Sequence, residues 1–305
     1  MNVTAKKIRF LITGCNGQLG YALSKEIKKR NHEIFGSDLS APEKVEYPFE
    51  IIDITDEECV LSIVKRIKPD VVIHCAAYTA VDDAEDKREL AYNINVKGTK
   101  NIAKACKETG SKLIYLSTDY VFNGKGDNPW EADSKEFGPE SVYAKTKLEG
   151  EFEVSSALKA DRFLIIRTQW VFGLNGKNFV KTMINLSKKY KQLRVVSDQI
   201  GRPTYTYDLA KLLVDMAESD KYGYYHVNNE GEYISWYEFA KAIFKEYGSD
   251  CEVIPVTTEE YGLSKAKRPL NSRLDTSKLS LNGFVPLPSW KDALKRYIKE
   301  LKEND

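Results

Sequence analysis

The sequence predicts an α/β protein, with a doubly wound parallel Rossmann-type sheet and a smaller interleaved α/β substrate domain. Two observations support this prediction. Apolar runs of strand length alternate with helical patterns along the first half of the 305-residue chain, which is typical of a parallel sheet covered on both faces. A glycine-rich turn follows the first apolar run and opens the first helical pattern, an arrangement typical of dinucleotide-binding domains.

The first apolar run covers residues 8–13 and is expected to be a buried strand, and a helical pattern covers residues 21–30. Between them lies the turn Gly14-Cys15-Asn16-Gly17-Gln18-Leu19-Gly20. Glycines in such a turn let the backbone approach a pyrophosphate, which the free N–H groups of the helix N-terminus bind. The GxxGxxG spacing alone is weak evidence, and a turn that serves only packing is the alternative. The strand–turn–helix context favours a dinucleotide site.

The second expected strand covers residues 32–38 and ends at Asp38. An acid about 20 residues after the first glycine hydrogen-bonds the adenosine ribose in dinucleotide-binding folds. A carboxylate there favours NADH, because it repels the 2′-phosphate of NADPH, yet Ser37 and its neighbours can still accommodate that phosphate. The alternative is that Asp38 only opens a turn. The expected cofactor is therefore NADPH or NADH.

The later elements continue the alternation of strands and helices. The expected strands are residues 47–54, 71–77, 112–118, 163–168 and 224–228, and the expected helices of the first half are residues 55–67 and 93–108. Thr55 and Glu58 match a capping box at the start of a helix. The strand 71–77 ends in the small residues Ala76 and Ala77, beside which a cofactor can lie.

Ligands of parallel α/β sheets bind at the carboxyl ends of the strands, where Thr118 is expected. Tyr143 and Lys147 follow in a helical run, and residues four apart share one face of a helix. A hydroxyl, a phenol and an ammonium beside a nicotinamide form a constellation that reduces carbonyl groups. We expect the ammonium to lower the pKa of the phenol, which is ordinarily about 10. Without this context, a Tyr–Lys pair is more often an exposed helix face.

The residues expected to bind the cofactor are spread along this edge. They are Gly14, Asn16, Gly17, Gln18, Leu19, Asp38, Asp53, Ile54, Ala76, Ala77, Tyr78, Tyr143 and Lys147.

Further strings along the chain extend the pattern of the glycine-rich turn and the YxxxK motif. They are residues 76–82, 117–122, 143–151 and 198–204. With them the chain resembles the dTDP-4-dehydrorhamnose reductase family of the extended short-chain dehydrogenase/reductase superfamily. Asn123, Gln169 and Phe172 depart from the family's pattern, in which Asp, Ser and Tyr are usual. The last two lie near the expected sugar site.

The resemblance implies NAD(P)H-dependent reduction of the C4 ketone of dTDP-4-dehydro-β-L-rhamnose to dTDP-L-rhamnose. It implies that Thr118, Tyr143 and Lys147 are catalytic, and that Thr118, Asp119 and Trp170 contact the substrate. Two alternatives stay open. One is a nucleotide-sugar epimerase of the same fold, and the other is an NAD(P)-binding regulatory subunit of another enzyme.

The second half is expected to divide between two domains. Residues 1–175 form the dinucleotide-binding domain, to which residues 193–230 partly return, and residues 176–192 and 231–305 form the smaller substrate domain. Ser235 and Glu238 match another capping box. Arg268 and Arg273 suit contact with a substrate diphosphate, and exposed surface charges are the equal alternative.

Composition argues against several classes of function. Lys and Arg number 46 and Asp and Glu 45, so no general attraction to nucleic acid or anionic membrane is expected. No apolar run reaches the roughly 20 residues of a membrane helix and no signal peptide is visible, so we expect a cytoplasmic protein. The five cysteines lack a CxxC and the three histidines lack ligand spacing, so neither disulfides nor a metal site is expected. The expected partner is a sugar-nucleotide substrate, and a homodimer is left open.

Overall fold

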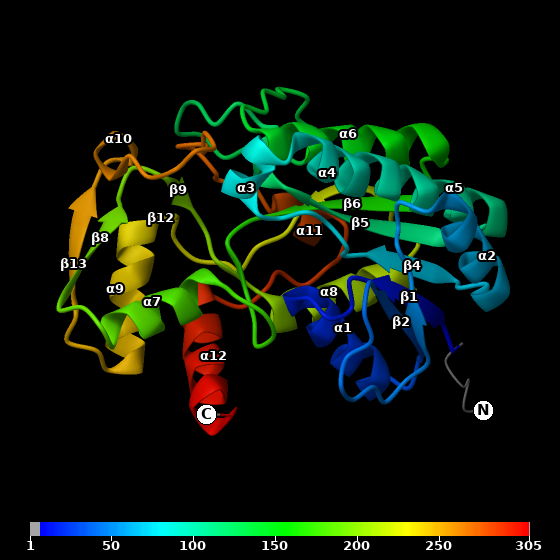
Figure 1. Ribbon diagram of the computed structural model, residues 1–305, viewed down its shortest axis with the longest axis horizontal. Coiled ribbons are helices and arrows are strands. Elements are labelled where there is room, and N and C mark those ends of the chain that lie inside the picture. Colours follow the sequence, from blue (N-terminus) through cyan, green and yellow to red (C-terminus); the bar gives the residue numbers. More distant parts are fainter. Residues whose placement is uncertain (1–6, 305) are drawn as a thin grey trace.

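A seven-stranded parallel sheet lies at the centre of the larger lobe (Figure 1). The structure is a computed structural model that describes residues 7–304. In spatial order the strands are β11 (Gly223–His226), β6 (Phe163–Thr168), β5 (Lys112–Thr118), β4 (Val71–His74), β1 (Arg9–Thr13), β2 (Glu33–Asp38) and β3 (Phe49–Ile51). Every neighbouring pair is parallel, and each strand overlaps an expected one. The predicted fold class is confirmed.

Helices cover both faces of this sheet, which explains why its central strands are apolar throughout. One face carries α1 (Gln18–Lys29) and α8 (Thr206–Glu218), and the other carries α2 (Glu57–Ile67), α5 (Thr99–Thr109) and α6 (Val142–Ala157) (Figure 1). Every residue of β4 and β6 is buried. Two hydrophobic clusters result, one under each layer of helices.

Three local expectations differ from the structure. The capping box at Thr55 is wrong, because Asp56 caps α2 by accepting from the Cys59 N–H, while the Thr55 hydroxyl donates to Asp53. Strand β3 ends at Ile51, so Asp53 lies in the loop beyond it. The helix expected over 93–108 begins as a π-helix, η1 (Asn93–Gly98), which continues into α5. Such π-turns are frequent at functional sites.

The smaller lobe has its own hydrophobic cluster. It is built from α7 (Phe179–Ser187), α9 (Trp236–Tyr247), α12 (Trp290–Asn304) and the parallel pair β8 (Gln192–Val196) and β13 (Glu252–Val256). The expected capping box is confirmed at the start of α9, where Ser235 and Glu238 bond each other's backbone N–H groups. The chain leaves the sheet after β6, returns with α8 and β11, and leaves again for α9.

Shorter elements complete the fold. Two further strand pairs are β7 (Val171–Phe172) with β10 (Thr204–Tyr205), and β9 (Ile200–Gly201) with β12 (Ile234–Ser235). The remaining short helices are α3 (Val81–Asp86), α4 (Arg88–Tyr92), η2 (Asp119–Val121), α10 (Thr258–Tyr261) and α11 (Ser277–Leu281). Across residues 7–304, no helix is both long and apolar enough to cross a membrane.

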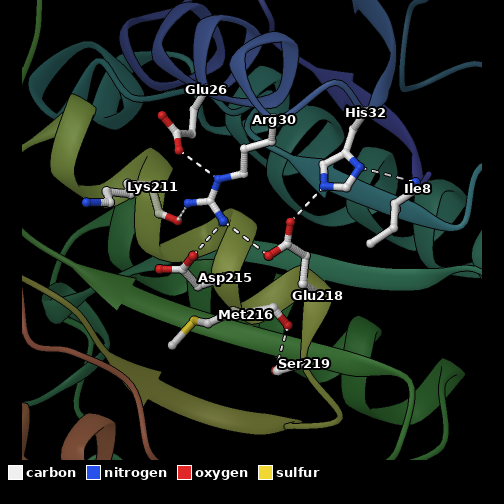
Figure 2. Close-up of polar contacts among 9 residues, drawn as sticks. All are labelled: Ile8, Glu26, Arg30, His32, Lys211, Asp215, Met216, Glu218 and Ser219. Atoms are coloured by element: carbon white, nitrogen blue, oxygen red, sulfur yellow. Dashed lines mark hydrogen bonds and ion pairs between the residues drawn. The ribbon is translucent and has the colours of Figure 1, made fainter. Parts of the chain in front are cut away.

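Polar contacts tie the returning helix α8 to the end of α1 and to the turn that follows it (Figure 2). The Arg30 guanidinium, at the end of α1, binds the carboxylates of Glu26 at 2.7 Å and Asp215 at 2.6 Å. A second residue of α8, Glu218, lies 3.1 Å from Arg30 and 2.7 Å from His32 Nε2. These contacts hold together two helices of one layer, and the contact between His32 and Glu218 joins residues 186 positions apart in sequence.

A buried ion pair joins α6 to the sheet. Arg167 of β6 and Glu151 of α6 are each 1% exposed, and two hydrogen bonds of 2.7 and 2.9 Å link them. The Ser117 hydroxyl of β5 donates to the same carboxylate, and Arg167 also donates to the Ala132 carbonyl. Both charges are therefore paired and hydrogen-bonded, as buried charges in proteins must be.

Arg167→Met is expected to lower the free energy of unfolding by about 3–5 kcal/mol, because it leaves the Glu151 carboxylate buried without its partner. The double variant Arg167→Met/Glu151→Gln buries no charge, so most of the loss should be recovered. Urea unfolding measures both changes. Lys65→Met, which removes an exposed pair with Glu108, is the control and should cost at most about 1 kcal/mol. A double variant as unstable as Arg167→Met would contradict this account.

Candidate active site

A cleft of about 860 Å³ lies along the carboxyl edge of the sheet. Its volume falls in the range of ligand sites, about 300–1,000 Å³. The ends of β1, β2, β4, β5 and β6 line one side, and residues of the smaller lobe line the other. The cleft therefore lies where ligands bind in open α/β sheets.

The glycine-rich turn fits a close approach of backbone to ligand. Gly14 has a φ of +66°, and a Cβ there would lie 2.7 Å from the Ala76 nitrogen. A Cβ at Gly20 would lie 2.4 Å from the Gly14 oxygen, so both positions exclude any side chain. Gly17 caps α1 without a side-chain hydrogen bond, which leaves the first N–H groups of the helix available to an anion. These residues fit the pyrophosphate of a dinucleotide.

Asp38 holds a turn by hydrogen bonds and also lines the cleft. Its Oδ2 accepts from the Asn16 N–H at 3.0 Å, and its Oδ1 accepts from the Leu39 N–H at 2.9 Å. The carboxylate thus holds the glycine-rich turn against the end of β2, and Asp38 also lines the cleft. Each oxygen retains lone-pair capacity for a ribose hydroxyl.

Thr118, Tyr143 and Lys147 meet in the cleft, as the sequence predicts. Thr118 ends β5, and Ser141 caps α6 by accepting from the Ala144 N–H, which places Tyr143 in the first turn of the helix. Lys147 lies one turn further along and is 3% exposed, and its ammonium donates to the Leu116 carbonyl at 2.6 Å. A hydroxyl, a phenol and an ammonium are thus brought together at the end of one strand.

Burial dominates the protonation of this group. It raises the pKa of Tyr143 to about 12, with hydrogen bonding to Thr118 acting in the opposite direction. It lowers the pKa of Lys147 to about 7, and the Glu151 carboxylate opposes that shift. The phenol pKa is therefore raised, whereas the sequence led us to expect a lowered value. The ammonium is directed to the Leu116 carbonyl, and among the described residues no hydrogen bond joins it to Tyr143.

Asp119 and Trp170 lie where a substrate would meet this group. Asp119 is 2% exposed, accepts from the Thr118 hydroxyl at 3.1 Å, and has a pKa that burial raises to about 7. Trp170 has a φ of +48°, a strained conformation for a side chain of its size, of the kind found at binding sites. Its ring stacks on Trp236 of α9 with the ring centroids 3.8 Å apart.

Fourteen of the sixteen predicted site residues line the cleft, and Asn16 and Tyr78 do not. Asn16 holds the turn from behind, since its amide donates to the Ser40 carbonyl. The Tyr78 hydroxyl donates to Asp83, away from the cleft. Neither candidate arginine lines the cleft: Arg268 pairs with Asp82, and Arg273 hydrogen-bonds Asn271.

The sequence reasoning placed the active site between the two domains but did not name several residues that line the cleft. These are Gln169, directly after β6, and Lys177, Phe179 and Trp236 of the smaller lobe. Gln169 was visible only as a departure from a family pattern, and Trp236 only as the first residue after a helix cap. No local pattern marks Lys177, because its place in the cleft depends on how the loop before α7 crosses to the larger lobe. That loop is held there by the Asn175 amide, which donates to the Asn16 carbonyl.

The chain is similar to known proteins in both sequence and fold. The family model described as RmlD substrate binding domain matches residues 8–303. The Bacillus subtilis spore coat polysaccharide biosynthesis protein SpsK is 39% identical over 292 residues, 96% of this chain and 97% of that protein. The Aggregatibacter actinomycetemcomitans dTDP-4-dehydrorhamnose reductase is 39% identical over 300 residues, 94% and 97% of the two chains. A crystal structure of the Bacillus anthracis dTDP-4-dehydrorhamnose reductase in complex with NADP has a TM-score of 0.89 and 41% identity, covering 97% of this chain and 100% of that one.

The buried Lys147 ammonium predicts a pH-dependent stability. Its pKa is about 7 in the folded protein and about 10.4 in an unfolded chain. Between these values the unfolded state binds more protons, so the stability contribution of this group rises with pH and is lost as pH falls through 7. The free energy of unfolding of the wild type relative to Lys147→Met should therefore rise by up to about 1.4 kcal/mol per pH unit.

Urea unfolding at pH 7, 8 and 9 measures this difference. Lys145→Met, at an exposed position of the same helix, is the control, and its difference from the wild type should be equal at the three pH values. A difference between Lys147→Met and the wild type that stays constant with pH would show that Lys147 is not desolvated as the structure indicates.

Proposed function

The chain belongs to the RmlD substrate binding domain family, and we propose that it is the enzyme that reduces the C4 ketone of dTDP-4-dehydro-β-L-rhamnose to give dTDP-L-rhamnose. The observation that carries the proposal is the convergence of Thr118, Tyr143 and Lys147 in the cleft that the glycine-rich turn also lines. The relatives from Aggregatibacter and Bacillus anthracis, which are dTDP-4-dehydrorhamnose reductases, support it.

The cofactor is NADPH or NADH, which supplies the hydride when bound. The N–H groups at the start of α1 hold its pyrophosphate, and the Asp38 carboxylate accepts hydrogen bonds from its adenosine ribose. Ala76 and Ala77, which follow β4, have small side chains and leave space for the nicotinamide ring. The exclusion of side chains at Gly14 and Gly20 keeps the turn close enough for these contacts.

The protein's own part of the reaction is the transfer of one proton. Burial keeps Tyr143 protonated at neutral pH, so its hydroxyl donates to the C4 oxygen while the Thr118 hydroxyl orients that oxygen. The C4 carbonyl becomes a secondary alcohol and Tyr143 is left as a phenolate. The Lys147 ammonium stabilises this phenolate until a proton from solvent restores the phenol. The raised pKa thus suits a proton donor, which is the role that reduction requires.

The substrate's sugar lies between Asp119 and Trp170, both of which line the cleft next to Thr118. An aromatic face and a carboxylate suit the apolar face and the hydroxyls of a deoxysugar. We further propose a cytoplasmic location. All five cysteines are free thiols, which suits a reducing compartment.

Tyr143→Phe is expected to reduce kcat at least 10²-fold, because general acid catalysis contributes about 10²–10⁴-fold. The loss of nicotinamide absorbance is measured with dTDP-4-dehydro-β-L-rhamnose made in situ, with NADH and NADPH side by side. Cofactor binding by the variant, followed by fluorescence, should be unchanged. Tyr225→Phe, at a buried tyrosine of β11 outside the cleft, is the matched control and should retain wild-type activity.

A folded wild type that binds a cofactor but oxidises neither NADH nor NADPH would overturn the proposal. Activity that survives in Tyr143→Phe would instead remove Tyr143 from the role of proton donor.

A further inference from the structure

One polar side chain in the cleft lacks hydrogen-bond partners. Gln169 follows directly after β6, lines the cleft and is 3% exposed. Neither its Oε1 nor its Nε2 hydrogen-bonds to any residue of the described chain. The mechanism described above gives this side chain no role.

An amide in this state is costly for the folded protein. A buried polar group without a hydrogen bond destabilises a protein by about 1–3 kcal/mol, and such groups are rare enough to require a reason. A buried glutamine that serves packing normally finds a partner, as Gln199 does: it is 5% exposed, and its Nε2 donates to the Thr258 hydroxyl at 3.0 Å. Gln169 and Gln199 are therefore equally buried but differ in their hydrogen bonding.

The packing around Gln169 holds its carboxamide in place. A Cβ at Gly201 would lie 2.4 Å from the Gln169 oxygen and 2.9 Å from the Trp170 ring. Gly201 belongs to β9, which pairs with β12, so the backbone of the smaller lobe lies directly against the amide. A glycine is needed at this position because the amide and the indole fill the space that a side chain would take. The amide oxygen therefore lies against this backbone, in a residue that lines the cleft.

The register of the sheet places Gln169 beside the reacting centre. Thr118 of β5 lies opposite Thr168 of β6, so Asp119 and Gln169 each follow this pair by one residue. Both line the cleft. The carboxamide oxygen of Gln169 lies against Gly201, and Gln169 is therefore on the side of the smaller lobe.

We propose that Gln169 recognises the sugar of the substrate, with its carboxamide donating to one hydroxyl oxygen and accepting from a hydroxyl of the same ring. The inference rests on the proposed function, because it takes the 4-keto sugar nucleotide as the ligand. A carboxamide both donates and accepts, and so do vicinal hydroxyls, which makes the two groups complementary. A site built to pair with hydroxyls rejects analogues that lack them, because its buried polar atoms then stay unpaired.

The test uses Gln169→Leu and Gln169→Ala, so that the result does not depend on how one substituent packs. For both variants we expect the KM for the sugar nucleotide to rise at least tenfold and the dissociation constant of NADPH to stay within twofold of the wild type. The melting temperature of ligand-free Gln169→Leu should stay equal or rise, because an unpaired amide has been replaced by an apolar side chain of similar size. The control Gln199→Leu should lower the melting temperature and leave the KM unchanged, since that amide is paired and lies outside the cleft.

Titration calorimetry with dTDP-L-rhamnose and NADP⁺ gives a second readout that needs no turnover, and a tenfold weaker binding of the sugar nucleotide is expected there too. A KM and a sugar-nucleotide affinity within twofold of the wild type would overturn the proposal. So would a rise in the dissociation constant of NADPH without loss of sugar affinity, which would place the amide on the nicotinamide carboxamide. A wild type that binds dTDP-L-rhamnose but reduces no keto sugar would refute the reductase activity alone, and the calorimetry would still decide the role of Gln169.

Discussion

The close packing of α6 on the sheet is the constraint on which the active site depends. Glu151 pairs with Arg167 of β6, and one turn earlier Lys147 bonds the Leu116 carbonyl of β5. Gly150 lies between them, where a Cβ would come within 2.3 Å of the Tyr115 hydroxyl. The helix can therefore lie against β5 only because this position has no side chain. That proximity brings the first turn of α6, with Tyr143, to the end of the strand that carries Thr118.

The burial of these side chains away from water also sets the chemistry of the site. Desolvation disfavours charge, so it keeps the phenol protonated and brings the pKa of the ammonium down to about 7. It also leaves the Gln169 carboxamide without hydrogen bonds. The buried ammonium and the unpaired carboxamide each cost the ligand-free protein stability, and each is of use only once a ligand is present. The cleft is therefore a region where folding and catalysis make opposite demands on the same residues.

The sequence predicts the larger lobe well because its signals are local. The central strands of the parallel sheet are apolar runs, and the glycine-rich turn occupies a fixed place after the first of them. The smaller lobe's share of the cleft is not predictable in this way, because Lys177 and Trp236 reach it through the crossing of distant segments. Spacing placed Tyr143 and Lys147 on one face, but it gave no sign that the ammonium turns to a strand carbonyl. The expected lowering of the phenol's pKa was wrong because burial, which spacing does not show, raises that pKa. Tyr78 likewise followed the correct strand but points to Asp83.

The path of the chain between the lobes limits how such a protein can change. The core of the smaller lobe draws on residues before α8 and after β11, whereas α8 and β11 pack in the larger lobe. Neither lobe is thus encoded by one continuous stretch of sequence. A genetic crossover at a single point cannot exchange the substrate side of the cleft for that of a relative while keeping the cofactor side intact. Substrate range in a protein of this architecture is therefore more readily altered by point changes at the seam, where Gln169, Trp170 and Gly201 meet, than by shuffling of modules.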